Sequence, residues 1–186
     1  MRSSAILLPL ALLTSAPLVA AEPVSVPAFK SMELRGGGNV IVRPGPAQVT
    51  IVDGSSQFTR FWVDGQGQLK IDACNERCPQ HYRLTIEIRY PTVLPMGVEG
   101  GGKITVAPGY GPQHTLAAGV SGGGVVDFRA VSGDTVAAGV NGGGKIMVGA
   151  SRKIAAAVSG GGEVLYSGDP DITRVVDGGG VVRKYD

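Results

Sequence analysis

The chain has 186 residues, enough for one domain with a hydrophobic core, and a nearly balanced net charge of +2. Such a balance provides no basic footprint for nucleic acid, so we expect no nucleic-acid partner. Thirty residues are glycine, a content that argues against a helical protein.

Residues 1–21 have the pattern of an export signal. Arg2 supplies the positive start, residues 5–18 are largely apolar, and small residues at 19–21 mark a cleavage site. A membrane anchor is the alternative, but the apolar run is shorter than the roughly 20 residues that a membrane span needs. No later segment could span a bilayer. We therefore expect an exported protein, located in the periplasm, on the outer-membrane surface or outside the cell, with residues 22–186 as a single domain.

Residues 29–95 predict a less regular β section. The segments "VTIVD", "FTRFWVD", "QLKIDA" and "YRLTIEIRY" look like strands, and in the last of them Leu84, Ile86 and Ile88 alternate with polar residues. The turns "RPGPA" and "DGQGQ" separate such segments. We expect this section to cover one end of the repeats that follow.

Cys74 and Cys78, in "CNERC", are the two cysteines of the chain. In an exported chain a disulfide is the leading interpretation. Four residues of extended strand would separate the Cα atoms by ~13 Å, and a disulfide needs less than ~7 Å, so the segment must form a tight turn. A metal site that adds His81 is the alternative, although no fourth ligand is apparent.

Residues 96–186 contain a repeat marked by glycine triplets. Including an earlier one, the triplets begin at Gly36, Gly100, Gly122, Gly142, Gly160 and Gly178. Two positions before the last five stand Val98, Val120, Val140, Val158 and Val176, and four positions after them stand Ile104, Val126, Ile146, Val164 and Val182. Apolar and polar residues alternate on both sides of each triplet, which predicts two strands per repeat, and a period near 20 is typical of a solenoid.

The triplets are interpreted as corners. Glycine adopts positive φ without a Cβ clash, and corners without side chains can stack at the strand spacing of about 4.8 Å. A flexible linker is the alternative, but it leaves the registered valines unexplained. Because every repeat runs in the same order, the coils should stack in parallel as a β-helix. Lys184 replaces an apolar residue in the last coil, which predicts a terminal cap exposed to water.

Residues 29–186 resemble an exported family described as "putative auto-transporter adhesin, head GIN domain". The resemblance rests on "LRGGGNVIV", on the five later triplets and on "YSGDP" at Tyr166–Pro170. It implies an all-β, right-handed parallel β-helix and an adhesin-like role, and it supplies no catalytic residues.

Residues with catalytic or metal-binding chemistry are scattered. His81 and His114 have no acid at a triad-like spacing, and no serine lies in a Gly-x-Ser-x-Gly motif. Asp169 and Asp171 could together hold calcium, but turn residues of this type are ordinary. We therefore predict no catalytic, cofactor-binding or metal-binding residue and no cofactor.

The outward positions of the repeats predict a contact surface. The segments "LAAGV", "VAAGV" and "IAAAV" before the corners are small and apolar on both faces, with outward positions at Ala117, Gly119, Ala137, Gly139, Ala155 and Ala157. This flat patch predicts contact with another copy, with the first-half strands or with a partner. Phe61, Trp62 and Tyr110 are aromatic candidates for glycan stacking, and Tyr110 lies in the longest turn.

The sequence thus favours an exported, non-catalytic protein that acts through surface contacts, in an adhesin-like manner, on a glycan or an envelope protein, with homo-oligomers also expected. One alternative is a carbohydrate-active enzyme on the same scaffold, which would need clustered acids on one outer face. Another is a structural or scaffolding protein of the envelope.

Overall fold

The computed structural model describes residues 21–75 and 77–185, so nearly all of the predicted export signal lies outside the described residues. Within these ranges every regular element is a β-strand, which confirms the all-β prediction. The strands are β1 (Glu22–Val24), β2 (Ser31–Gly36), β3 (Asn39–Pro44), β4 (Gln48–Asp53), β5 (Arg60–Val63), β6 (Gln68–Asp72), β7 (Thr85–Tyr90), β8 (Met96–Gly100), β9 (Lys103–Val106), β10 (Gln113–Gly122), β11 (Val125–Gly142), β12 (Lys145–Ser159), β13 (Glu163–Ser167), β14 (Asp171–Asp177) and β15 (Val181–Lys184). No helix of the described part is long and apolar enough to cross a bilayer.

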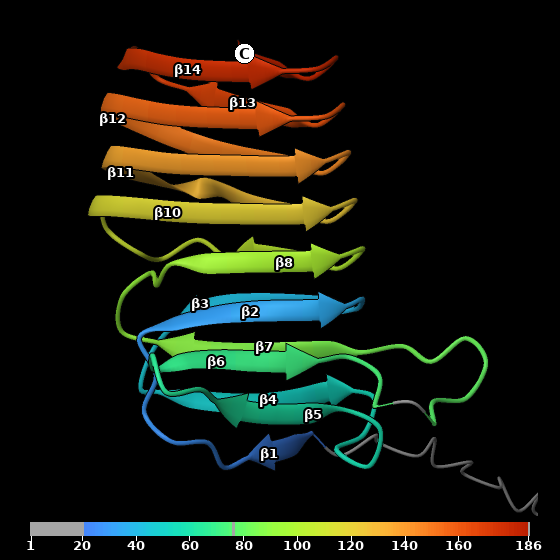
Figure 1. Cartoon of the computed structure of the whole chain (residues 1–186). Helices are drawn as coiled ribbons and strands as arrows, with labels where there is room; N and C mark the ends of the chain where they lie inside the picture. The colour runs from blue at the N-terminus through green and yellow to red at the C-terminus, as the bar shows by residue number, and fades with distance from the viewer. Residues whose placement is uncertain (1–20, 76, 186) are drawn as a thin grey trace, which may run out of the picture.

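The strands form two stacked layers that face each other (Figure 1). The first sheet runs β5–β6–β2–β8–β10, then through the second halves of β11 and β12 to β14. The second sheet runs β1–β4–β7–β3–β9, then through the first halves of β11 and β12 to β13 and β15. The pairs β1–β4, β4–β7 and β5–β6 are antiparallel and lie at the N-terminal end of the stack. The other pairs are parallel.

The glycine triplets connect the two sheets, and they stack in the register that the sequence predicts. Val120 pairs with Val98 and Val140, and Gly122 pairs with Gly100 and Gly142. Gly142 has φ +113°, and a Cβ added to it would lie 2.8 Å from the carbonyl oxygen of Gly122. Backbone conformation and close stacking therefore both require glycine at this corner.

The core lies between the two sheets and consists of aliphatic ladders. The valines before each triplet and the Ile or Val residues after it point inward. In the four coils from β8 to β13 these residues are at most 4% exposed: Val98, Val120, Val140, Val158, Ile104, Val126, Ile146 and Val164. The apolar residues recur at fixed distances from the glycines because they occupy equivalent buried positions in successive coils.

The order of the coils in space differs from their order in the chain. The coil of β2 and β3 lies between the coil of β6 and β7 and the coil of β8 and β9. Residues 29–95 therefore do not only cover one end of the stack, because they also form two of its coils. Between β6 and β7 no triplet is present, and the described residues 73–75 and 77–84 form no strand. They include the predicted Cys74–Cys78 disulfide, with Cα atoms 5.8 Å apart.

The C-terminal end of the stack is less closed than the sequence predicts. Lys184 is exposed as expected, and its Nζ lies 3.8 Å from a carboxylate oxygen of Asp169. However, Ile172 is 42% exposed and Val176 is 41% exposed, although both occupy inward positions. No further coil follows within the described residues, and one lysine side chain cannot cover two aliphatic ladders.

Candidate binding face

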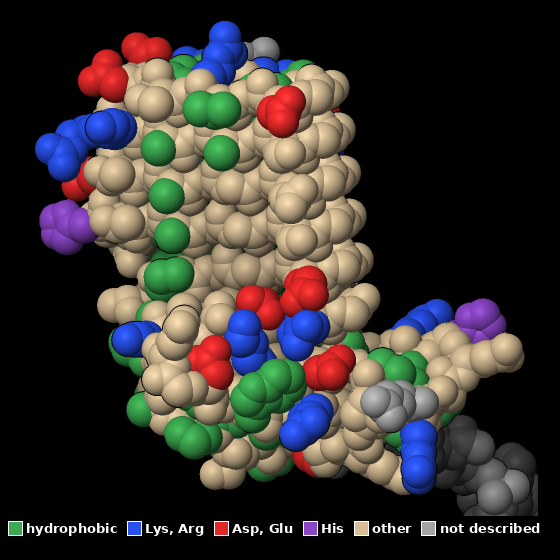
Figure 2. Space-filling model, viewed as in Figure 1, with side chains coloured by type: hydrophobic (Ala, Val, Ile, Leu, Met, Phe, Trp, Pro, Cys, Tyr) green, Lys and Arg blue, Asp and Glu red, His purple; other side chains and the backbone are tan. Residues whose placement is uncertain are grey.

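The outer side of the first sheet is nearly free of long side chains over four coils (Figure 2). We call this surface the smooth face and define it by the outward positions of β8, β10, β11 and β12: Gly97, Ala117, Gly119, Ala137, Gly139, Ala155 and Ala157. Strand alternation sends their neighbours Ala118, Ala138 and Ala156 into the core. The outward set predicted from the sequence is therefore found on one continuous surface.

The glycines of the smooth face differ from the corner glycines in their surroundings. Nothing lies within 4 Å of a Cβ added to Gly119 or Gly139, and neither residue has a positive φ. A Cβ on Gly97 would meet its nearest atom, Cγ of Glu33, at an ordinary 3.7 Å. The fold itself therefore does not explain glycine at these positions, where it weakens a strand.

A charged cluster bounds the smooth face toward the N-terminus. Nζ of Lys70 lies 2.9 Å from Oε2 of Glu33, and Nε of Arg35 lies 2.8 Å from Oε2 of Glu99. The hydrogen bond to Glu99 raises the pKa of Arg35, so the guanidinium stays charged at any physiological pH. These long side chains stand where the glycine column begins, because Glu33 pairs directly with Gly97.

The other boundary of the smooth face lies in β14. Val175, which is 66% exposed, continues the glycine column through Ala157, and Asp177 continues the column of Ser121, Asn141 and Ser159. Between the two boundaries the surface forms a shallow groove of about 1090 Å³. Its floor consists of backbone and Cβ atoms, with the polar column of serine and asparagine along one side.

The outer side of the second sheet has a different character. A groove of about 820 Å³ is lined there by four charged residues among uncharged ones. The four are Arg43, Lys103, Asp127 and Arg129. Asp127 is only 4% exposed, and Arg129 donates to its carboxylate from Nη2 at 2.7 Å and from Nε at 2.9 Å. Burial alone would raise the pKa of Asp127, but the hydrogen bonds and charge of Arg129 outweigh it and lower the pKa.

Tyr110 and Trp62, two of the three aromatic candidates for ligand contact, have partners within the chain. The hydroxyl of Tyr110 donates to the carbonyl of Tyr90 at 3.0 Å, and burial raises the pKa of Tyr110 to about 12. Trp62 and Phe61 are half-buried on β5, and the guanidinium of Arg60 lies 5.3 Å from the centre of the Trp62 ring. Neither Trp62 nor Tyr110 lies on the smooth face, and their contact with a ligand stays a prediction.

The alternative metal sites lack support in the structure. Both cysteines are bonded to each other, so the sulfur ligands proposed beside His81 are not free. Asp169 lies near Lys184, and among the described residues no group of three or more His, Cys, Asp or Glu side chains could hold a metal ion.

One pair that sequence spacing missed is His114 and Asp134. Nδ1 of His114 lies 3.4 Å from Oδ2 of Asp134, because parallel stacking places residues about one repeat apart side by side. The imidazole is fully exposed at the edge of the coil, and Nη2 of Arg152 lies 4.0 Å from the same oxygen. The signal that could have found this pair is the repeat period of 20 residues rather than a catalytic motif.

The fold and the repeat define the chain as an all-β protein whose parallel strands are joined by glycine triplets. Residues 94–170 match the model of the family described as "Putative auto-transporter adhesin, head GIN domain". The match confirms the resemblance that the triplets and "YSGDP" indicated. No curated protein matches the chain.

Several solved structures are similar to the chain at low identity. A "putative adhesin" from Bacteroides fragilis is 16% identical, with 89% of this chain and 96% of that chain covered and a TM-score of 0.48. A "putative cell adhesion protein" from Clostridium sporogenes is 12% identical, with 89% and 98% covered and a TM-score of 0.42. A "putative lipid binding protein" from Parabacteroides distasonis is 15% identical, with 90% and 96% covered and a TM-score of 0.36. Likenesses of this degree carry no conclusion about the activity of this chain.

Proposed function

We propose that this protein is an exported, non-catalytic, adhesin-like protein that binds a glycan or an envelope protein through its smooth face. The scaffold is, in this proposal, a right-handed parallel β-helix formed by residues 22–186 as one domain. Parallel register through the repeated coils supports the β-helix, and the head GIN domain at residues 94–170 supports the adhesin-like role and a location at the cell envelope or outside the cell.

The observation that carries the proposal is glycine at Gly119 and Gly139. A residue that lowers strand stability and is not required by local packing points to a requirement from outside the chain. Without a Cβ at these positions, a ligand can approach the backbone closely. Apolar contact over the flat alanines would supply most of the binding free energy.

The polar column beside the floor fits a ligand with both apolar and hydroxyl-rich surfaces. Ser121, Asn141 and Ser159 are exposed and lie one coil apart along the stack. Their hydroxyl and amide groups both donate and accept hydrogen bonds. A glycan chain lying along the stack would meet alanine and glycine with its C–H faces and this column with its hydroxyls.

The carboxyl groups favour this proposal over a carbohydrate-active enzyme. A glycosidase acid needs a raised pKa so that it is protonated when it donates. Hydrogen bonds or neighbouring charges lower the pKa of Glu22, Asp64, Glu87, Asp127 and Glu163. These groups are held ionised, a state that suits ion pairs on a scaffold.

A binding array tests the proposal. The purified protein is applied to immobilised glycans and envelope proteins together with the variants Gly139→Glu and Gly143→Glu. Both positions have free space for a side chain and no positive φ, but Gly143 lies at a corner and Gly139 on the smooth face. We expect binding that Gly139→Glu abolishes and Gly143→Glu preserves.

Two results would overturn the proposal. Binding that is equally strong in both variants would exclude the smooth face as the contact surface. A folded wild-type protein that binds nothing on the array would favour the alternative of a structural or scaffolding protein.

A further inference from the structure

The outer side of the second sheet is richer in cations than in carboxylates. From β7 through the stack to β15, its outward positions hold six cationic side chains and three carboxylates, an excess of three positive charges. The cations are Arg43, Arg89, Lys103, Arg129, Lys145 and Arg183, and the carboxylates are Glu87, Asp127 and Glu163. The whole chain has a net charge of only +2, so positive charge is concentrated on this side.

The carboxylates are less exposed than the cations that pair with them. Nε of Arg43 at 3.0 Å and Nε of Arg89 at 2.8 Å both donate to Glu87, whose side chain is about half as exposed as theirs. The side chain of Asp127 is 6% exposed, and that of its partner Arg129 is 54% exposed. The third carboxylate follows the same order. A ligand on this side therefore meets positive charge first.

Several donors on this side are not used within the chain. Arg43 and Arg89 both bind Glu87 through Nε, which leaves their Nη groups without a hydrogen-bond partner among the described residues. Lys103 is exposed and forms no ion pair in the described part of the chain. A guanidinium group binds a carboxylate through two parallel hydrogen bonds, and an ammonium group binds it as a point charge. The unused groups therefore suit an anion from outside the chain.

The groove of about 820 Å³ brings such donors together with uncharged polar groups. Arg43, Lys103 and Arg129 line it from the adjacent strands β3, β9 and β11. Asn39 and Thr105 line it as well, and their amide and hydroxyl groups both donate and accept hydrogen bonds. The groove thus offers contacts for anions and, beside them, contacts for hydroxyl groups.

The spacing of the cations favours a polymer of moderate charge density. Neighbouring strands lie about 4.8 Å apart, so the paired residues Arg43 and Arg89 are separated by one such interval and Arg43 and Arg129 by two. Double-stranded DNA carries one charge per about 1.7 Å, which would also bring phosphates against the carboxylates. No outward residue of these strands is aromatic, so single-stranded nucleic acid would lack stacking partners.

We propose that a carboxylate-bearing polysaccharide binds along the outer side of the second sheet, with its carboxylates at Arg43, Lys103 and Arg129 and its hydroxyl groups at Asn39 and Thr105. The two sheets face each other across the core, so this site lies on the opposite side of the molecule from the smooth face. It is a second site, and it does not depend on the function proposed above.

Binding to polygalacturonate and to alginate, two polysaccharides with carboxylates, tests the proposal at physiological salt, with neutral dextran for comparison. We expect binding to both acidic polymers, none to dextran, and a loss of affinity as the salt concentration rises. Lys103→Glu should weaken binding roughly tenfold or more, because the reversed charge repels the carboxylates. Arg43→Gln should weaken it by a smaller factor, since it removes one cation while Glu87 keeps Arg89 as its partner.

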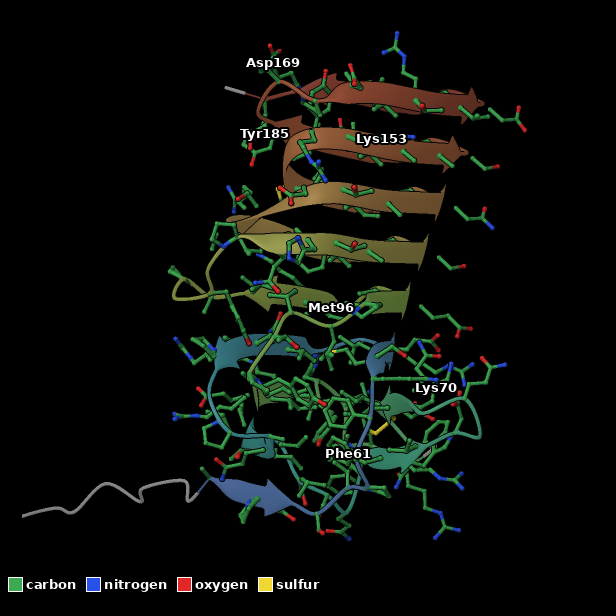
Figure 3. The ribbon with its side chains drawn as sticks, turned by 90° about the vertical axis from the view of Figure 1, so that its left-hand side faces the viewer. Phe61, Lys70, Met96, Lys153, Asp169 and Tyr185 are labelled. Atoms are coloured by element: carbon green, nitrogen blue, oxygen red, sulfur yellow. A yellow bond between two sulfur atoms is a disulfide. The ribbon has the colours of Figure 1, made fainter. Side chains whose placement is uncertain are left out.

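Lys153→Glu is the matched control. Lys153 is an exposed lysine of the first sheet, where β12 pairs with β14 (Figure 3), so the same change of charge there should leave binding unchanged. Gly139→Glu should also leave it unchanged, which separates this site from the smooth face. Circular dichroism of each variant verifies that folded proteins are compared.

Three results would overturn the proposal. The first is a folded protein that binds neither acidic polymer. The second is a loss of affinity in Lys153→Glu or Gly139→Glu as large as that in Lys103→Glu. The third is tighter binding to duplex DNA or to phosphatidylglycerol vesicles than to either polysaccharide.

Discussion

The repeated coils of residues 96–186 and the section of residues 29–95 stabilise similar strands by different means. In the coils, identical or similar aliphatic residues stack on one another, and bare glycine backbone turns each corner. In the first section the aliphatic ladder continues through Leu34, Val40 and Ile86. Individual pairs add to it there, namely Glu33 with Lys70, Phe29 with Tyr90 and Tyr82 with Thr59, together with the disulfide.

The difference shows how a repeat frees a surface for other use. Because ladders and corners stabilise the coils, the outward positions of the first sheet in β10 to β12 need no ion pairs and can remain small. The outer side of the second sheet does carry such pairs, as with Asp127 and Arg129 or Lys145 and Glu163. The first section has charged pairs on its outer side, as with Arg43 and Glu87 at 3.0 Å. A smooth face therefore belongs to the repeated part and ends where the pairs begin.

The largest effect is expected from a break in an inner ladder. Ile146 is fully buried in the middle of the stack, so Ile146→Ala should lower the free energy of unfolding by about 4 kcal/mol. Ile172→Ala changes the same residue type at the open end, where 42% of the residue is exposed, and should cost less than about 1 kcal/mol. Urea unfolding of both variants measures the contrast, and equal losses would refute the ladder as the source of stability.

Corner substitution should have the next largest effect. Gly142→Ala forces a Cβ into positive φ and against the Gly122 carbonyl, and should cost about 3 kcal/mol. Gly143→Ala, one residue further on and in open space, serves as control and should be nearly neutral. Differential scanning calorimetry of the two variants decides whether stacking at the corner is as close as the structure shows.

Reduction of the disulfide should affect the first section alone. The Cys74–Cys78 bridge closes a short loop, so its removal by Cys74→Ser with Cys78→Ser should cost about 2 kcal/mol. Hydrogen exchange should accelerate in residues 73–84 and stay unchanged in β10 to β12. Faster exchange throughout the coils would show that the two regions depend on each other more than their contacts indicate.

A smaller effect is expected from pH in the coils. The folded pKa of Asp127 is lowered, so its ion pair stabilises the protein above the unfolded value of about 3.9, and this contribution is lost as the pH falls through the folded value. Asp127→Asn should remove this part of the acid sensitivity. The measurement is the free energy of unfolding of wild type and Asp127→Asn, from neutral pH to below about pH 4. If both proteins lost the same amount of stability over this range, the Asp127–Arg129 pair would have no effect.

The sequence predicted the regular part of the molecule more fully than the irregular part. The valine columns and the glycine corners repeat five times, so that register could be counted from the residues alone. In the irregular part no such count is available. Between Tyr90 and β8, Val93 is buried and Leu94 is half-buried, and no repeat distinguishes the two positions.

The candidate site could be predicted in its floor but not in its boundaries. Alternation alone identified the outward alanines and glycines. The charged cluster joins β2, β6 and β8, which are distant in the chain, and the position of the β2–β3 coil inside the stack has no local signal. The pair His114–Asp134 likewise depends on which coils are neighbours.

The free energy of unfolding of Gly139→Ala decides whether the fold needs a glycine on the smooth face. We expect stability that is unchanged or higher by up to about 1 kcal/mol, since alanine restricts the unfolded chain and meets no atom within 4 Å in the folded one. A loss of more than about 1 kcal/mol would show that this glycine serves the fold and not a ligand.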